Sequence, residues 1–537
     1  MPNEQSHLTN SQIEVDPREL YREEVEAHGG EESSIPFEET DFIQKYGAIN
    51  VEYIQPPPKS RFFTRPHALN YFHAGKLYRT RNERSSSVLE LFLDLLYVGI
   101  VAALASQATE KCDGLALLKY IILFIPVWTV WADLKDFMNY YYNDDLTQRL
   151  YVLWIMVLLV IYANNSNYVL ESHSETAMVV ISYMLCRYSS AAAYFFYSFY
   201  VMEHKSQIRL YSILIIITTC IWIPVIFIGI RAKIGLSIAI MFLEQLSFSM
   251  SFHPITKNFL KLEYSTALNI EHEVERFGAF YTIAIGEFLY GIVTAHITGS
   301  GINDKMWKAI LVLIIGYIFM FLYFNGEGSV IAVHALRRNV NTSFAWIFLH
   351  IPLIGSLILV ADASSELVKL SEIPLAKNFE QEISLYGLSF YFSAGICIAL
   401  FCLGFIAMMD KPIDDISSKH VPKNFRILPR FPIGIIIMCL SFAELKPAKL
   451  LGLTTLLLGI LFSYEIIVME SKKLLRNGCS NKNLRERTQN QKQNKNKNDV
   501  TDTNRNFTRN NESTPNNNYK GQDEDEDEEE IIGNEVI

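Results

Sequence analysis

The chain has 537 residues, of which half are hydrophobic and only 19% are charged, and this composition excludes an ordinary soluble protein. The formal net charge is −10, but the acidic run at 523–530 contributes eight of these charges, so the rest is close to neutral. No cationic patch indicates a nucleic-acid partner. Apolar residues gather in blocks of about 17 to 25, each long enough to cross about 30 Å of hydrocarbon as a helix.

The hydropathy pattern predicts an all-α polytopic membrane protein with about 12 transmembrane helices. An acidic, polar N-terminal region (1–60) and an Asn-rich, acidic tail (472–537) are expected to be disordered, because neither can bury enough apolar surface. A basic juxtamembrane segment (61–87) precedes two membrane halves, 88–252 and 253–471. The expected spans are 88–108, 115–133, 150–170, 176–202, 210–230, 234–252, 277–297, 307–324, 344–364, 385–409, 427–443 and 448–469.

The basic residues orient this bundle. Lys and Arg are frequent before the first span and after the tenth, whereas the loop after the third span (164–175) has none. Because such residues favour the cytosolic side, we expect both termini in the cytosol, in a membrane that the sequence does not identify. The eleventh span begins near Pro429 and Pro432. If it is re-entrant or merged with the twelfth, the C-terminal end changes side.

A short pattern recurs in the first and seventh spans. Asp94 and Glu287 are each followed three residues later by a tyrosine, Tyr97 and Tyr290, in the pattern acid, x, Leu, Tyr. The recurrence indicates a duplication of six spans, which would form a 6+6 parallel repeat about an axis along the membrane normal. Coincidence among leucine-rich helices stays open as the alternative.

Ionisable side chains in the predicted spans are the candidate functional residues, because charge in hydrocarbon costs roughly 3 kcal/mol. Glu90 and Asp94 share a helix face with Tyr97 and are close enough to share a proton. Arg187 is the one cation in the middle of a predicted helix, so we expect it to pair with Asp94, Glu90 or Glu287. Secondary candidates are Glu244 and His350, while His296, Asp362 and Glu465 lie near span ends and are expected to be interfacial.

No sequence motif indicates an enzyme, a cofactor or a metal site. The nucleotide-binding, nucleophile-elbow and zinc-helix motifs do not occur. His272 has Glu271, Glu273 and Glu275 beside it, but this charged segment entering a helix is expected to be a solvated face. The seven cysteines form neither a disulfide framework nor a metal pattern.

Two blocks resemble the signatures of the low temperature requirement protein A family. The first, RSSSVLELFLDLLYV at 84–98, is similar to the family's basic residue, Ser or Thr, and E-L-F-F-D-L, with Leu93 in place of a phenylalanine. The second, HEVERFGAFYTIAIGE at 272–287, is similar to H-L-x-E-R-x-G-L-F-x-I-I-x-L-G-E, with Glu273 and Ala279 in place of leucines. The motif positions are Glu90, Asp94, Glu275, Arg276, Gly286 and Glu287.

This resemblance covers residues 80 to 470 and implies a multi-pass membrane protein of poorly defined molecular activity. The long Asn-rich tail suggests a eukaryotic, fungal-type member of the family. The resemblance therefore supports the predicted fold and the membrane location, but it does not indicate a molecular activity.

Intramembrane charge leads to the first functional hypothesis, a secondary transporter or ion pathway. Asp94 and Glu287 would flank a central site and exchange protons or a cation, and Arg187 would hold one acid ionised. The rival hypothesis is a non-transporting sensor, scaffold or assembly factor whose buried charges pair helices. The expected partners are the lipid bilayer and a small solute or ion of unknown identity, with protein partners of the acidic tail as a further interpretation.

Overall fold

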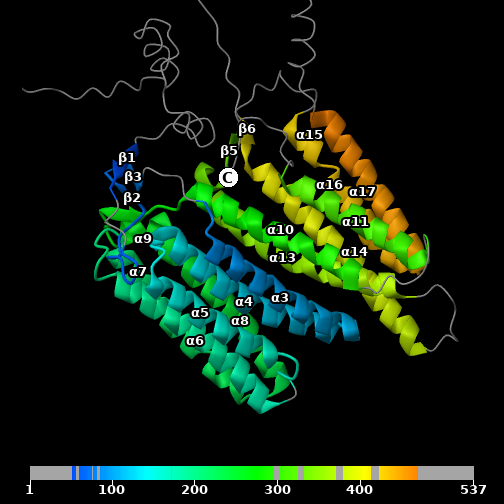
Figure 1. Ribbon diagram of the computed structural model, residues 1–537, viewed down its shortest axis with the longest axis horizontal. Coiled ribbons are helices and arrows are strands. Elements are labelled where there is room, and N and C mark those ends of the chain that lie inside the picture. The colour runs from blue at the N-terminus through cyan, green and yellow to red at the C-terminus, as the bar shows by residue number, and fades with distance from the viewer. Residues whose placement is uncertain are drawn as a thin grey trace, which may run out of the picture. The chain divides into compact units, whose positions relative to one another are not determined.

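The computed structural model describes residues 51–55, 60–74, 76–80, 85–170, 172–294, 301, 303–324, 332–370, 379–412 and 422–469. Long helices run side by side, with those of the first half on one side and those of the second half on the other (Figure 1). The first half contains α3 (Val88–Lys111), α4 (Gly114–Tyr141), α5 (Leu146–Asn164), α6 (His173–Tyr197), α7 (Lys205–Cys220) with η1 (Ile223–Ile226), and α8 (Ile230–Phe252). The second half contains α10 (Ile270–Thr294), α11 (Asp304–Phe324), α13 (Val340–Lys369), α14 (Phe379–Met409), α15 (Lys423–Ile427), α16 (Arg430–Leu440), η3 (Ser441–Ala443) and α17 (Pro447–Met469), with short helices α9 (Pro254–Phe259) and α12 (Ala335–Arg338) in connecting segments.

Eleven helical segments in the described part are long and apolar enough to cross a membrane. The remaining expected span, 176–202, corresponds to α6, which has 25 residues and packs between α5 and α7 but is less apolar. A helix of this length extends about 37 Å, so α6 matches its neighbours in reach. The prediction of an all-α, multi-pass membrane protein is confirmed.

Several expected boundaries shift for local reasons. The second span was expected to end at 133, but α4 continues to Tyr141. The eleventh span is broken, since α15 ends before Pro429 and α16 starts after it, as expected where proline removes a backbone donor. The seventh span was expected to begin at 277, whereas α10 begins at Ile270, because its charged first turns find partners inside the protein.

A small sheet connects the chain before α3 with the chain before α10. Its order is β1-β3-β2-β4, formed by β1 (Val51–Ile54), β2 (Asn70–His73), β3 (Lys76–Thr80) and β4 (Tyr264–Thr266). β2 pairs with β4 antiparallel, and Arg79 on β3 forms an ion pair with Glu271 at 3.0 Å. The sheet therefore holds the first turns of α3 and α10 close together.

Strand β1 falls within the N-terminal region that was expected to be disordered, so that boundary is corrected. The strand forms because β3 offers a parallel partner edge. The rest of that region, 1–50, and the tail from 470 lie outside the described residues. In the second half, β5 (Ala332–Val333), which lies between α11 and α12, pairs with β6 (Lys411–Pro412), which lies between α14 and α15.

The packing order of the first half partly recurs in the second. α3 packs on α4 as α10 packs on α11, and α6 packs on α7 as α14 packs on α16. The environments of the recurring residues differ, however, since Tyr97 is buried and Tyr290 is 66% exposed. The 6+6 repeat stays a prediction.

His204 joins the sheet to the helices in the connection between α6 and α7. Its Nε2 lies 3.1 Å from the Asn70 carbonyl oxygen, and its Nδ1 lies 2.8 Å from the Tyr141 hydroxyl. Because a carbonyl oxygen only accepts, Nε2 carries the hydrogen and Tyr141 donates to Nδ1. Burial lowers the pKa of His204 to about 3, so the ring is neutral in the folded protein.

Stability should therefore fall as the pH drops below the ordinary histidine pKa of 6.5, because the unfolded chain binds a proton that the folded chain excludes. Between pH 7.5 and 5.5 this one site should cost about 1.4 kcal/mol. Unfolding midpoints in detergent at both pH values measure the effect. His204→Gln should lose this part of the pH dependence, and an identical pH dependence in both proteins would contradict the assignment.

Candidate functional site

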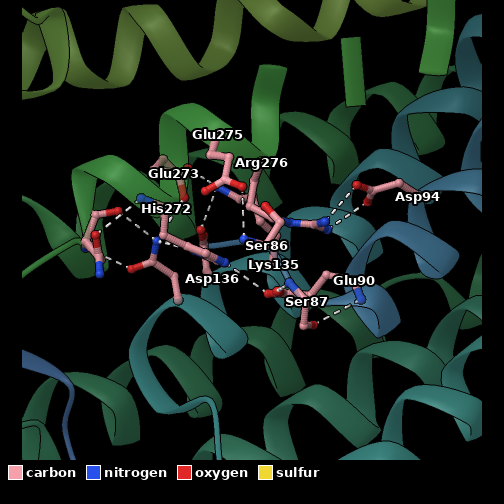
Figure 2. Close-up of polar contacts among 12 residues, drawn as sticks. Ser86, Ser87, Glu90, Asp94, Lys135, Asp136, His272, Glu273, Glu275 and Arg276 are labelled. Atoms are coloured by element: carbon pink, nitrogen blue, oxygen red, sulfur yellow. Dashed lines mark hydrogen bonds and ion pairs between the residues drawn. The ribbon is translucent and has the colours of Figure 1, made fainter. Parts of the chain in front are cut away.

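An ion pair between α3 and α10 joins the two motif blocks. Arg276 donates from its two terminal nitrogens to the two oxygens of Asp94, at 2.7 Å each, and both side chains are fully buried (Figure 2). The Trp131 indole N–H on α4 donates to the same carboxylate at 2.8 Å. Asp94 is thus held by three hydrogen bonds in a geometry that suits arginine and carboxylate.

Glu90 has two roles at the start of α3. It forms a capping box with Ser87. The Glu90 carboxylate accepts from the Ser87 backbone N–H, and the Ser87 hydroxyl accepts from the Glu90 backbone N–H. Its other oxygen lies 3.1 Å from Nε2 of His272. Asn139 donates to Nδ1 of the same ring, so Nε2 carries the hydrogen that Glu90 accepts. Glu275, the neighbouring motif acid, accepts from the Ser86 backbone N–H at 3.1 Å.

The expectation of a solvated face is therefore wrong for His272 and Glu273, whereas Glu275 is exposed. His272 and Glu273 are fully buried, because α4 and α3 supply polar partners to this turn of α10. Among the described residues, no group of three or more His, Cys, Asp or Glu side chains is arranged to hold a metal ion.

Lys135 on α4 connects this cluster to the bundle interior. Its ammonium contacts the carboxylates of both Asp136, at 2.8 Å, and Glu273, and it lies 4.8 Å from the centre of the Phe277 ring. Its side chain is only 2% exposed. One cation is thus shared by two buried carboxylates.

A second charged cluster lies where α4, α6 and α8 meet. Arg187 donates to Asp133, and its Nε lies 3.9 Å from Glu244. Tyr211 donates to Asp133 at 2.6 Å. Glu244 accepts from the Tyr183 hydroxyl at 2.8 Å and from the Trp222 indole N–H at 3.1 Å. The expected pairing of Arg187 with Asp94, Glu90 or Glu287 is wrong, because Asp133 on the adjacent helix is nearer.

These side chains line a cavity inside the helices. Its charged residues are Asp133, Lys135, Asp136, Arg187 and Glu244, and aromatic residues from α8, α10 and α13 complete the wall. The free space holds about one or two water molecules. The cavity therefore places charged groups of three helices around a small space with room for water.

Glu287 does not join Asp94, so the central site expected from these two acids is not formed. Arg276 holds Asp94, and Glu287 lies eleven residues later on α10, about 16 Å along the axis. Glu287 is partly exposed and lies within electrostatic range of Asp362. In the part of the chain that the structure describes, no hydrogen bond or ion pair joins Gly286 or Tyr290 to either charged cluster. The motif acid of the seventh span thus stands apart from that of the first.

The secondary candidates have separate surroundings. His350 hydrogen-bonds to the Trp346 carbonyl oxygen at 2.8 Å and to the Tyr323 hydroxyl at 3.1 Å. Glu465 was expected to be interfacial, but it is buried and accepts two hydrogen bonds from Arg430, at 2.7 and 2.8 Å. Asp362 accepts from Thr109, and His296 lies outside the described residues.

Sequence reasoning missed the cavity's α4 residues. Three charged residues close together in the sequence, Asp133, Lys135 and Asp136, could have indicated this site. The predicted span ended at 133, so Lys135 and Asp136 were placed outside it. The sequence also indicated Arg187 as the one cation in the middle of a predicted helix. Lys135, Arg276 and Arg430, which lie outside or at the start of the predicted spans, are buried as well.

The comparison with protein families matches residues 85–467 to the model described as bacterial low temperature requirement A protein (LtrA). The match includes both motif blocks, which the Asp94–Arg276 and Glu90–His272 contacts bring together. No curated protein and no solved structure matches the chain. Because the family model covers most of the chain, this protein belongs to the LtrA family.

Proposed function

We propose that this protein is a transporter or ion pathway that moves protons or small cations through the cavity between α4, α6 and α8. The observation that carries the proposal is a charge imbalance. Two cations, Lys135 and Arg187, are each shared by two buried carboxylates, those of Asp136 and Glu273 and those of Asp133 and Glu244 respectively. The two clusters thus hold four acids for two cations.

Such an excess is unstable in a low-dielectric interior. Neighbouring carboxylates resist simultaneous ionisation, so two protons or an equivalent cationic charge would balance the group. Because Asp133, Asp136 and Glu244 line the cavity, water in it can deliver and remove that charge. A cluster that exchanges charge with water inside a membrane protein has the chemistry of a coupling site.

Two buried polar atoms without a hydrogen-bond partner in the described part of the chain support a hydrated route. The Tyr97 hydroxyl and Arg187 Nε are buried and have no hydrogen-bond partner among the described residues. Tyr97 lies within electrostatic range of both Asp133 and Asp94. A water molecule beside this hydroxyl would link the cavity to the α3–α10 contacts drawn in Figure 2.

The proposal includes an orientation and a partner set. If α6 spans the membrane with the eleven more apolar helices, the chain crosses twelve times, and the basic segments favour both termini in the cytosol. Transport is proposed instead of enzymatic catalysis, with a solute or ion of unknown identity, and the acidic tail remains a candidate site for protein partners.

Glu244→Gln should reduce pH-driven or cation-driven flux at least tenfold, because the amide keeps the size of the side chain but cannot exchange a proton. The measurement is the internal pH and cation content of proteoliposomes containing the purified full-length protein. Asp136→Asn should act in the same direction. Glu366→Gln is the matched control, since Glu366 is 39% exposed and pairs with Lys369 away from the cavity. Full flux through the Glu244 variant, or no flux through the wild-type protein, would overturn the proposal.

A non-transporting sensor, scaffold or assembly factor is the second candidate. The Asp94–Arg276 and Arg430–Glu465 pairs favour it, because both are fully buried and matched charge for charge. For this function, charge-neutral variants of the cavity would change stability while no flux appears under any gradient.

A further inference from the structure

A second cavity, separate from the charged one, lies near the ends where α4, α6 and α8 begin. Its empty volume is about 520 Å³ when the open mouth is counted. Leu123, Val179, Val180 and Val225 form much of its wall, and Lys233 lies at its edge. The cavity thus combines an apolar wall with one buried cation.

The ammonium of Lys233 has no acidic partner among the described residues. It donates to the Thr176 hydroxyl at 2.9 Å and to the Val169 carbonyl oxygen at 3.5 Å, and its residue is only 6% exposed. Two neutral acceptors leave the buried positive charge unbalanced. The charge also lies in the first turn of α8, where the helix dipole favours an anion nearby.

The distances of Lys233 and of the apolar wall from the helix ends suit an amphiphilic ligand. Lys233 is three residues into α8, so it lies about 5 Å from the helix end. Pro126 and Tyr183 are twelve and ten residues into their helices, so the apolar wall extends about 15 to 18 Å inward. A charged edge above an apolar wall complements a molecule with an anionic head and a hydrocarbon chain.

We propose that this cavity binds an acyl-chain anion from the adjoining leaflet, with Lys233 contacting its carboxylate or phosphate head. The chain lies against the valines of α6 and η1. The site is independent of the proposed transport, although its inner wall includes Tyr183 and Trp222, the two donors to Glu244.

The test uses a photoreactive oleic acid analogue on the purified full-length protein in neutral phosphatidylcholine nanodiscs. Crosslinks should map by peptide mass spectrometry to segments 119–126, 176–183 and 222–237. Oleate should displace the probe at concentrations about tenfold lower than oleyl alcohol, because a hydrogen bond to a charged group contributes roughly this factor. Phosphatidic acid in the nanodiscs should also displace it if phospholipid is the source, whereas displacement by oleate alone would identify a free fatty acid.

Lys233→Gln should abolish the preference for oleate over oleyl alcohol, and Lys233→Arg should keep it. Retained binding of the alcohol shows that the variant is folded. Lys305→Gln, at a lysine in the first turn of α11, is the matched control and should leave the preference unchanged. Crosslinks confined to other helices, or an unchanged preference in Lys233→Gln, would overturn the proposal.

Discussion

Replacing Lys135 with methionine should destabilise the protein by about 3–5 kcal/mol, the range for breaking a buried ion pair. The substitution leaves the carboxylates of Asp136 and Glu273 buried beside each other without the ammonium they share. It keeps most of the apolar packing against Phe277, because methionine has a similar length. The loss is measured as the shift of the unfolding midpoint in a denaturing-detergent titration.

The second change, Glu273→Leu, should recover much of that loss when combined with Lys135→Met. It removes one of the stranded carboxylates and introduces the leucine that is commoner at this position in the family pattern. Glu273→Leu alone should be tolerated, because Lys135 retains Asp136. Additive losses from the two substitutions would contradict the assigned contact.

Arg276→Gln should cost about 3–5 kcal/mol as well, because it leaves the Asp94 carboxylate buried with the Trp131 indole N–H as its remaining donor among the contacts described above. The double variant Asp94→Asn and Arg276→Gln should lose clearly less than the sum of the two single variants, since neither charge is then stranded. The same detergent titration provides the measurement.

The exposed pair Arg149–Asp144 is the matched control for this prediction. Its side chains are 57% and 41% exposed at a similar separation of 3.0 Å, so Arg149→Gln should cost no more than about 1 kcal/mol. Equal losses at Arg149 and Arg276 would show that burial does not set the strength of the α3–α10 contact.

The link between the two motif blocks could not be predicted from the sequence. Asp94 and Arg276 are separated by 182 residues, and no helical periodicity determines which distant residue a buried acid meets. The sheet that pairs β2 with β4 brings the starts of α3 and α10 together, where His272 and Glu90 are in contact.

Arg187 illustrates the same limit. Its sequence position correctly indicated a buried cation, but all the candidate partners on α3 and α10 were wrong, since α6 packs on α4 and meets Asp133 there. The cavity was missed because the length of α4 was underestimated. Lys135 is tolerated inside that helix through its contact with Glu273 on α10, and Asp136 through its ion pair with Lys135.

The sequence by itself indicated that the chain lies in a membrane, where its helices are, which family it belongs to and which charged residues lie in the membrane-spanning helices. All of these follow from local composition and spacing. The tertiary structure alone decided which charges pair with one another, which acids share a cation beside a cavity, and which cation faces an apolar cavity. Those outcomes depend on short distances between helices, and the energy of a buried charge is set by its nearest partner.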